Sequence, residues 1–327
     1  MKDTKWVLVT GASGFVGRRL CAYLRTQGAR IRAVQRTYAE GPWDEQVCID
    51  LGACALAPSV LAGVSSVYHL AGRAHAMSEL NAHDLHQHAT VRATENLLAA
   101  CSDAKPQSLV FLSTTKAVAD PGAQLVDESF KMPPNTPYGL AKSMAEEKVL
   151  NWGSARSTRV CVLRTPMVLG RDAKGNAMAM LRQVRAGRFP PLAEMGNRRS
   201  VLHVQDLVEG LVHVSYHACA DGECFYICDP RTYSTRQLLD VMRRSCGQSI
   251  PKWSVSSAVL RTAALLGDLA TVLLRRAMPF DSQRYARLAE SAAFSPARLR
   301  ELTGFEARHT LDDAIAEMFA VLGPLRC

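Results

Sequence analysis

Three glycines spaced three residues apart, Gly11, Gly14 and Gly17, constrain the fold of this chain more than any other feature. They follow an apolar run at residues 6–9 that is typical of a β-strand, and they precede a helical pattern at residues 18–27. In this setting Gly11 permits a tight turn, Gly14 lets the backbone approach a pyrophosphate, and Gly17 lets helix and strand pack closely. The phosphates would sit on the free N–H groups and positive dipole of the helix. The pattern therefore predicts a dinucleotide-binding strand–turn–helix unit.

A second motif lies downstream, where Tyr138 and Lys142 are four residues apart. On a helix, two side chains at this spacing lie on one face, one turn apart. A lysine ammonium in that place favours the phenolate, so we expect Lys142 to lower the pKa of Tyr138. Tyr138 would then serve as a general acid and base.

Hydroxyl side chains end the apolar run at residues 108–115, which is typical of a buried strand. An open α/β sheet places its ligands at the carboxyl ends of its strands. Counting along the strand from Phe111 makes Thr114 the catalytic hydroxyl, whereas counting back from Val118 makes it Thr115. Because the strand register is the firmer anchor, we expect Thr114 to hydrogen-bond the reacting oxygen.

Strand-like and helical runs alternate through the first half of the chain. Strands are expected at 6–9, 30–34, 46–49, 66–70, 109–112 and 159–163, and helices at 18–27, 90–100 and 138–152. Alternation of this kind predicts an α/β fold with a doubly wound parallel sheet of the Rossmann type. From about Pro166 the alternation ends, which predicts a smaller, mostly helical lobe.

Several motifs together resemble those of a known family. They are the T-G-x-x-G-x-x-G turn at 10–17, His-Leu-Ala-Gly at 69–72, Ser113-Thr114, the Tyr138/Lys142 pair, Leu-Arg-Thr-Pro at 163–166, and R-x-x-x-H-V-x-D at 199–206. The chain resembles the extended short-chain dehydrogenase/reductases that act on nucleotide sugars. The resemblance implies a dinucleotide-binding domain at 1–165, to which 201–228 returns, and a substrate-binding lobe at 166–200 and 229–327.

The end of the second predicted strand bears on the choice of cofactor. An NAD-preferring site places an acid there for the ribose 2′-hydroxyl, whereas this chain has Gln35-Arg36. An arginine suits a 2′-phosphate, so NADP(H) is preferred and NAD(H) stays open, as does a surface role for Arg36. The resemblance implies that Asp50 binds the adenine, and it leaves the contact of Thr90 open because relatives usually have Asn there. The expected cofactor-binding residues are Gly11, Ser13, Gly14, Phe15, Val16, Gly17, Arg36, Asp50, Leu51, Leu70, Ala71, Gly72, Ser113, Tyr138, Lys142 and Pro166.

The resemblance also implies a substrate site. Asn176 begins a helix that suits a diphosphate, and Arg199 matches an arginine that contacts the nucleotide phosphate. Leu192 ends a segment that resembles one lying along a uracil ring. Helix capping and surface charge are the plain alternatives for Asn176 and Arg199, and a loop histidine without a role is the alternative for His75. The expected substrate-binding residues are His75, Thr114, Asn176, Leu192, Arg199 and Arg284.

The composition narrows the partners. A formal net charge of +9 suits anionic ligands such as dinucleotides and nucleotide diphosphates. Nucleic acid is disfavoured because the arginines are dispersed rather than gathered in a stripe. The cysteines at 219, 224 and 228 fit no zinc spacing, and the histidines at 83, 86 and 88 are expected on a solvated surface, so no metal is predicted.

One apolar stretch, residues 255–274, is long enough to be considered for a membrane span. It contains Arg261 and Asp268, whose charges cost several kcal/mol in a bilayer, about 3 kcal/mol each. A helix that is buried or covered by a partner is favoured, and no membrane insertion is expected. No signal peptide is recognised ahead of the first strand, so a cytoplasmic location is expected.

The resemblance permits several reactions. A reductase that reduces a UDP-4-keto-6-deoxy-N-acetylhexosamine for surface polysaccharide synthesis is favoured by Gln35-Arg36. A UDP-sugar 4-epimerase with tightly bound NAD is the alternative, and a non-catalytic dinucleotide-binding protein is the outside alternative. Dehydration is disfavoured because Thr115-Lys116 stand where a dehydratase has Asp-Glu. A homodimer is expected, since the helices at 90–100 and 138–152 form a dimer bundle in many relatives.

Overall fold

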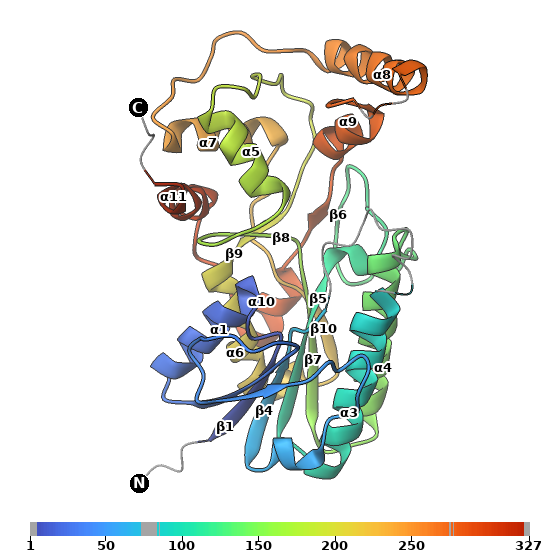
Figure 1. Ribbon diagram of the computed structural model, residues 1–327, viewed down its shortest axis with the longest axis vertical. Helices are drawn as coiled ribbons and strands as arrows, with labels where there is room; N and C mark the ends of the chain where they lie inside the picture. Colours follow the sequence, from blue (N-terminus) through green and yellow to red (C-terminus); the bar gives the residue numbers. More distant parts are fainter. Residues whose placement is uncertain (1–4, 73–83, 85, 275, 277, 324–327) are drawn as a thin grey trace.

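Seven parallel strands form the central sheet, and they lie in the spatial order β3-β2-β1-β4-β5-β7-β10. The computed structural model describes residues 5–72, 84, 86–274, 276 and 278–323 (Figure 1). The strands are β1 (Trp6–Thr10), β2 (Arg30–Gln35), β3 (Glu45–Cys48), β4 (Val64–His69), β5 (Ser108–Thr114), β7 (Arg159–Thr165) and β10 (Glu223–Tyr226). The predicted doubly wound parallel sheet of the Rossmann type is confirmed.

Helices cover both faces of this sheet (Figure 1). On one face Val7 and Val9 pack with α1 (Phe15–Thr26) and α6 (Val204–Tyr216). On the other face Leu8 packs with α3 (Ala93–Ala104) and α4 (Pro137–Ser154). Because both faces are buried, the strands read as continuous apolar runs.

The strand order reverses between β1 and β4, since the chain leaves β1 toward β2 and later returns to β4. Ligands of open α/β sheets bind at the carboxyl ends of the strands at such a point. Gly11 follows β1 there with φ +69°, and a Cβ on it would lie 2.9 Å from the nitrogen of Ala71, which follows β4. The loops after β1 and β4 therefore pack so closely that no side chain fits at Gly11.

A second body with its own core lies at one end of the sheet (Figure 1). Its buried residues include Leu181, Leu239 and Ile315. Its elements are β8 (Met167–Leu169), α5 (Asn176–Arg185), β9 (Val201–His203), α7 (Thr235–Ser245), α8 (Ser257–Leu274), α9 (Ser282–Ala289) and α11 (Leu311–Val321). Strand β8 pairs with β9, and the short β6 (Leu125–Val126) pairs with β11 (Ala293–Phe294), which α10 (Ala297–Thr303) follows. The division into domains, with its boundaries, stays a prediction.

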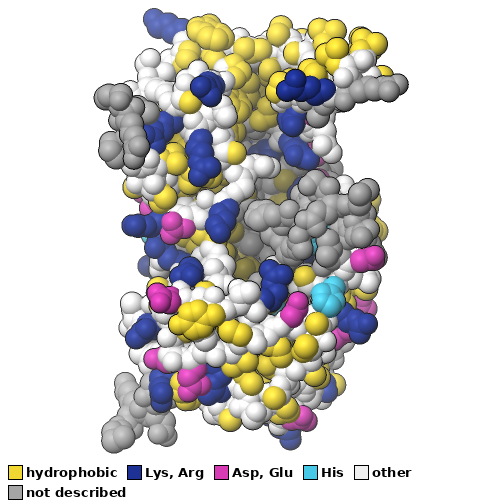
Figure 2. Space-filling model, viewed as in Figure 1, with side chains coloured by type: hydrophobic (Ala, Val, Ile, Leu, Met, Phe, Trp, Pro, Cys, Tyr) yellow, Lys and Arg dark blue, Asp and Glu magenta, His cyan; other side chains and the backbone are white. Residues whose placement is uncertain are grey.

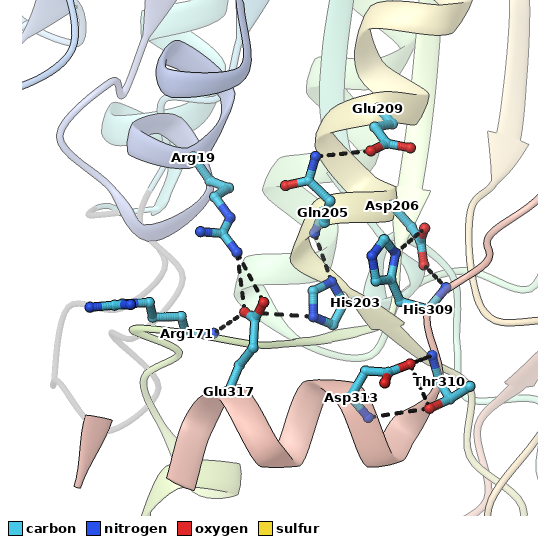
Figure 3. Close-up of polar contacts among 10 residues, drawn as sticks. All are labelled: Arg19, Arg171, His203, Gln205, Asp206, Glu209, His309, Thr310, Asp313 and Glu317. Atoms are coloured by element: carbon cyan, nitrogen blue, oxygen red, sulfur yellow. Dashed lines mark hydrogen bonds and ion pairs between the residues drawn. The ribbon is translucent and has the colours of Figure 1, made fainter. Parts of the chain in front are cut away.

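A polar network joins the two bodies (Figure 3). Glu317 of α11 accepts hydrogen bonds from Arg19 of α1 at 3.1 Å and from the backbone nitrogen of Arg171 at 3.0 Å. His203, which caps α6, places Nε2 3.6 Å from the same carboxylate. Asp206 accepts from the ring of His309 at 2.8 Å. The R-x-x-x-H-V-x-D segment thus contributes its histidine and aspartate to the junction.

Helix α8 lies at the end of the second body that is farthest from the sheet (Figure 1). It is apolar and long enough to cross a membrane, with a mean hydropathy of 1.5, yet only 11% of it is buried in the protein. Of the two alternatives expected for this helix, burial within the chain is wrong, because the helix packs mainly on α9 and buries only Leu260 and Ala264. Cover by a partner stays a prediction. Its other side faces outward.

Candidate active site

The glycine turn after β1 has the geometry of a phosphate cradle. Gly14 caps α1 with extended backbone angles, no side chain caps the helix, and its first turn holds no acid. A Cβ on Gly17 would lie 2.3 Å from the carbonyl oxygen of Gly11, so only glycine fits there. A Cβ on Gly14 would meet only that same oxygen, at 3.2 Å. Helix α1 begins at Phe15, three residues earlier than predicted, so the N–H groups of Phe15 and Val16 open its first turn.

The expected adenosine side is built by the ends of β2 and β3. Gln35 is buried and donates from Nε2 to Gln46 at 2.6 Å, while its Oε1 has no hydrogen-bond partner in the described part of the chain. Arg36 is exposed beside it. Asp50 accepts from the nitrogen of Gly52 at 2.9 Å and stays partly exposed. Leu51 is buried, and its carbonyl accepts from Asn96 at 2.7 Å.

A buried histidine supports the loop after β4. His69 places Nδ1 2.7 Å from the hydroxyl of Thr10 and Nε2 3.0 Å from the hydroxyl of Thr94. Thr94 donates its own proton to the carbonyl of Thr90, so it accepts from Nε2–H, and Thr10 must donate to Nδ1. Burial, with a smaller effect of Lys142, lowers the pKa of His69 to about 3. The ring is therefore neutral, and Thr10 is free to accept from the nitrogen of Ala71 at 3.1 Å.

Thr114 and Tyr138 are brought together at the carboxyl end of β5. Thr114 is the last residue of β5, and Tyr138 lies in the first turn of α4, which Thr136 caps. Burial raises the pKa of Tyr138 to about 12, and a hydrogen bond with Thr114 opposes the rise. Thr115 is buried in the following 3-10 turn. Thr114, the hydroxyl that the strand register selects, thus contacts Tyr138, and its catalytic role stays a prediction.

Lys142 lies one turn further along α4 and is buried. Its Nζ donates to the carbonyl of Leu112 at 2.7 Å and lies 4.4 Å from the ring centre of Phe111. Burial lowers the pKa of Lys142 to about 8, and the charge of Glu146 opposes the fall. The lowered tyrosine pKa that the sequence predicts is not found here, because desolvation of Tyr138 outweighs other influences.

Glu146 anchors a buried charge cluster behind the site. Its carboxylate receives Arg164 at 2.6 Å from Nη2 and 3.0 Å from Nε, and it also accepts from the hydroxyl of Ser113. The hydroxyl of Ser113, a residue expected to contact the cofactor, donates to this carboxylate, and the cofactor contact stays a prediction. The cluster links the carboxyl ends of β5 and β7 to the middle of α4.

Several buried polar atoms at the sheet end have no partner among the described residues. They are Oγ1 of Thr90, Oγ1 of Thr165, next to Pro166, and Oε1 of Gln35. A Cβ on Gly72 would lie 3.4 Å from Nζ of Lys142 and 3.6 Å from Oγ1 of Thr90. Unpaired buried polar groups are costly unless a ligand satisfies them. These atoms and the uncapped start of α1 fit a dinucleotide with ribose hydroxyls and a pyrophosphate.

Two residues expected to bind substrate have free polar groups. Arg199 is partly buried, donates from Nη2 to the carbonyl of Arg287, and keeps a buried Nε that has no hydrogen-bond partner among the residues described. Asn176 is exposed at the start of α5, which has no side-chain cap and no acid in its first turn. Both places suit an anion.

The remaining substrate candidates are placed differently. Leu192 is 1% exposed and packs in the core of the second body, so its side chain offers no stacking surface. Arg284 lies on α9, where it pairs with Asp281 at 3.2 Å. His75 lies outside the described residues.

His86 lies at the site, although the sequence did not predict it there. His86 was expected on a solvated surface, but it is 1% exposed, and its ring centre lies 5.5 Å from that of Tyr138. The π-helix Gln87–Arg92 follows it and turns Thr90 inward. Such π-turns often mark functional sites. Within the described part of the chain, no cluster of His, Cys, Asp or Glu could hold a metal ion.

The fold and this site define a dinucleotide-dependent enzyme of the extended short-chain dehydrogenase/reductase type. The chain belongs to the NAD dependent epimerase/dehydratase family, whose model matches residues 7–228.

Individual relatives span most of the chain. A ketoreductase from Stigmatella aurantiaca that acts on a farnesylated dihydroquinoline oxide is 29% identical over 80% of this chain and 79% of the relative. The N-acetyl-alpha-D-glucosaminyl-diphospho-ditrans,octacis-undecaprenol 4-epimerase of Escherichia coli O157:H7 is 25% identical over 94% of this chain and 92% of that protein. A solved UDP-glucuronic acid 4-epimerase from Bacillus cereus, in complex with NAD, has the same fold with a TM-score of 0.75 and 16% identity. That match covers 96% of this chain and 97% of the other.

Proposed function

We propose that this protein is an NAD(P)-dependent oxidoreductase acting on C4 of a UDP-sugar, and that it reduces a UDP-4-keto-6-deoxy-N-acetylhexosamine. The observation that carries the proposal is the pairing of Thr114 with Tyr138 above the buried Lys142. This pairing lies at the carboxyl end of β5, the strand next to β4, and the strand order reverses between β4 and β1. Proton exchange at an alcohol or ketone oxygen is the chemistry that such a pair supplies.

In the proposed reaction, a bound nicotinamide supplies the hydride to the keto carbon. Thr114 holds the keto oxygen by a hydrogen bond, and Tyr138 gives that oxygen its proton. Tyr138, with a pKa of about 12, holds its proton at neutral pH and can give it to an alkoxide, which is a far stronger base. Lys142 and Thr90 would hold ribose hydroxyls, because Nζ and the unpaired Oγ1 both lie beside Gly72.

NADP(H) is the proposed cofactor because the exposed Arg36 directly follows the second strand, where an acid would mark NAD. The guanidinium makes no ion pair with the described residues, so it is available to a 2′-phosphate.

Two free cationic or dipolar sites support a sugar diphosphate as substrate. The unpaired Nε of Arg199 and the uncapped start of α5 lie in the second body, where a nucleotide diphosphate would be held. The relatives from E. coli and B. cereus are named for sugars carried on a diphosphate. A homodimer and a cytoplasmic location remain predictions.

A UDP-sugar 4-epimerase with tightly bound NAD is the second candidate. The unpaired Oε1 of Gln35 favours it, since that oxygen would accept from the ribose 2′-hydroxyl that NAD has and NADP lacks. A non-catalytic protein is the outside alternative, and the presence of both Tyr138 and Lys142 argues against it.

The test follows reduced-nicotinamide absorbance and sugar-nucleotide chromatography in one reaction. We expect NADPH to be consumed in proportion to the 4-hydroxy sugar formed from the 4-keto substrate, with little interconversion of UDP-GlcNAc and UDP-GalNAc. Tyr138→Phe should lower turnover by roughly 10²–10⁴-fold, whereas Tyr216→Phe, at an exposed tyrosine, should not. Epimer interconversion without added cofactor and without an absorbance change would decide for the epimerase.

A further inference from the structure

Helix α8 turns two of its polar side chains, Asp268 and Thr271, toward the protein and most of its leucines to the outside. Asp268 accepts from the hydroxyl and the backbone nitrogen of Ser282 at the start of α9. One turn later, Thr271 accepts from the nitrogen of Met278 at 3.2 Å. Helix α8 approaches the chain before α9 closely at Gly267, where a Cβ would lie 2.0 Å from the carbonyl oxygen of Phe280. This is the reverse of a surface helix, whose apolar side faces the protein.

The opposite side of α8 is a continuous apolar surface, which we call the outer face. Its large side chains are each between 55% and 74% exposed, and they are Val259, Leu265, Leu266, Leu269, Val272, Leu273 and Leu274. Figure 2 shows hydrophobic side chains gathered at the end of the molecule where Figure 1 places this helix. Large contiguous apolar patches of this kind mark interaction sites.

The charge around the outer face is positive. Residues 252–287 contain six basic side chains, including Arg261 and Arg276, and two acidic ones, Asp268 and Asp281. Both acids are engaged, Asp268 with Ser282 and Asp281 with Arg284. Two copies of the chain meeting through this face would bring basic rims together, whereas an anionic lipid surface complements them.

The flanking residues favour a lipid surface as well. Trp253, shortly before α8, is 64% exposed and follows Lys252. Tryptophan and basic residues beside an apolar helix face are typical of helices that lie in the membrane interface.

The contacts of α8 favour lying on the bilayer over crossing it. A spanning orientation would break the bonds of Asp268 and Thr271 to the chain around α9. It would also place Arg261 and Asp268 in hydrocarbon, which is costly. Helix α9 is itself held to the core, because Asn197 donates to the carbonyl of Leu288 at 3.2 Å.

We propose that the outer face of α8 docks on an anionic phospholipid bilayer and lies flat in its interface, with the basic side chains at the headgroups. The protein is then a peripheral membrane protein that binds through its second body. This proposal does not rest on the proposed reaction.

The test is flotation of the full chain with two kinds of vesicle. One kind consists of phosphatidylcholine alone, and the other contains about 30% phosphatidylglycerol in phosphatidylcholine. We expect the protein to bind the anionic vesicles and to bind phosphatidylcholine vesicles only weakly. Salt at about 0.5 M, or alkaline carbonate, should release the bound protein. Leu266→Gln with Leu273→Gln should weaken binding by about a hundredfold, since two exposed leucines lose their burial. Arg261→Gln with Arg276→Gln should weaken binding to anionic vesicles by about 25-fold, about fivefold per basic residue. Leu125→Gln with Leu302→Gln, at exposed leucines away from α8, is the matched control and should bind as the wild type does.

Wild-type protein that stays free of both vesicles would overturn the proposal. So would a dimer in lipid-free light scattering that Leu266→Gln with Leu273→Gln converts to a monomer, because the outer face would then be covered by a second copy. Resistance to carbonate extraction would overturn the flat orientation in favour of a span. Cofactor fluorescence titration of each variant shows that its fold is intact, since none of the substituted residues lies in the site.

Discussion

Replacing Lys142 with methionine should reveal the free-energy cost of burying its charge. Lys142 is 4% exposed. Its Nζ donates to the carbonyl of Leu112 and lies near the ring of Phe111 and the charge of Glu146. These contacts compensate burial only in part, since the pKa of Lys142 is lowered from 10.5 to about 8. Methionine has similar length and no charge.

The size and sign of the effect follow from this shift. The unfolded chain holds a proton on Lys142 up to about pH 10.5, whereas the folded chain releases it above about pH 8. Between these values the unfolded state binds more protons, so the stability of the wild type rises with pH. Below pH 8 the cost is fully present and amounts to about 3 kcal/mol, at about 1.4 kcal/mol per pH unit.

The assay is urea unfolding of both proteins without cofactor at several pH values from 7 to 10.5. The free energy of unfolding of the wild type minus that of Lys142→Met should increase by about 3 kcal/mol across this range. Groups that titrate elsewhere cancel in the difference. Lys148→Met is the matched control, because Lys148 is on the same helix and forms only a surface ion pair with Glu95, worth at most about 1 kcal/mol.

A difference that stays constant from pH 7 to pH 10.5 would refute the reasoning. It would mean that the carbonyl of Leu112 and the carboxylate of Glu146 fully replace the water that Lys142 loses. A difference that decreases with pH would refute it more strongly, since the lysine would then be stabilised in its charged form.

Three further outcomes are expected. Arg36→Ala should weaken NADPH binding by about 1–3 kcal/mol and leave NADH binding nearly unchanged in calorimetric titration, with Arg25→Ala on α1 as the control; equal losses for both cofactors would exclude a 2′-phosphate contact. Gly17→Ala should destabilise the protein by about 1–3 kcal/mol or more in urea unfolding, because the new Cβ meets the backbone oxygen of Gly11 at 2.3 Å, and an unchanged unfolding midpoint would contradict this. The folded pKa of His69 is lowered to about 3, so the wild type should lose stability as pH falls from 6.5 toward 3, by up to about 1.4 kcal/mol per pH unit. His69→Gln should flatten that pH dependence. Parallel stability curves of the wild type and the variant would show that the ring is not buried in its neutral form.

The sheet and the glycine turn could be predicted because both depend on residues that are close together in the sequence. Apolar runs with strand periodicity, separated by helical patterns, fix a parallel sheet. The glycines at 11, 14 and 17 lie where a Cβ would come within 2.3–3.2 Å of backbone atoms. The Tyr138/Lys142 spacing is likewise local to one helix.

The electrostatics of the site could not be predicted, because they depend on distant contacts. Arg164 reaches Glu146 only once β7 packs on α4, and desolvation of Tyr138 depends on what covers α4. His86 appears polar by its neighbours in the sequence, but the chain turns it against Tyr138. The position of α8 also escapes local reasoning, since an apolar helix with two internal charges is typical of a buried helix. Only the contacts of Asp268 reveal which side faces out.

The bond between Arg19 and Glu317 has a consequence for the order in which the molecule is completed. The two residues are 298 positions apart. At a synthesis rate of 5–20 residues per second, the arginine waits roughly 15–60 s for its partner to be made. The glycine turn and all seven strands of the sheet, the last of which ends at Tyr226, are made before Glu317, so the half of the protein that holds the glycine turn can assemble first. The newly made chain therefore acquires its nucleotide-binding half before the junction that aligns the second body against it.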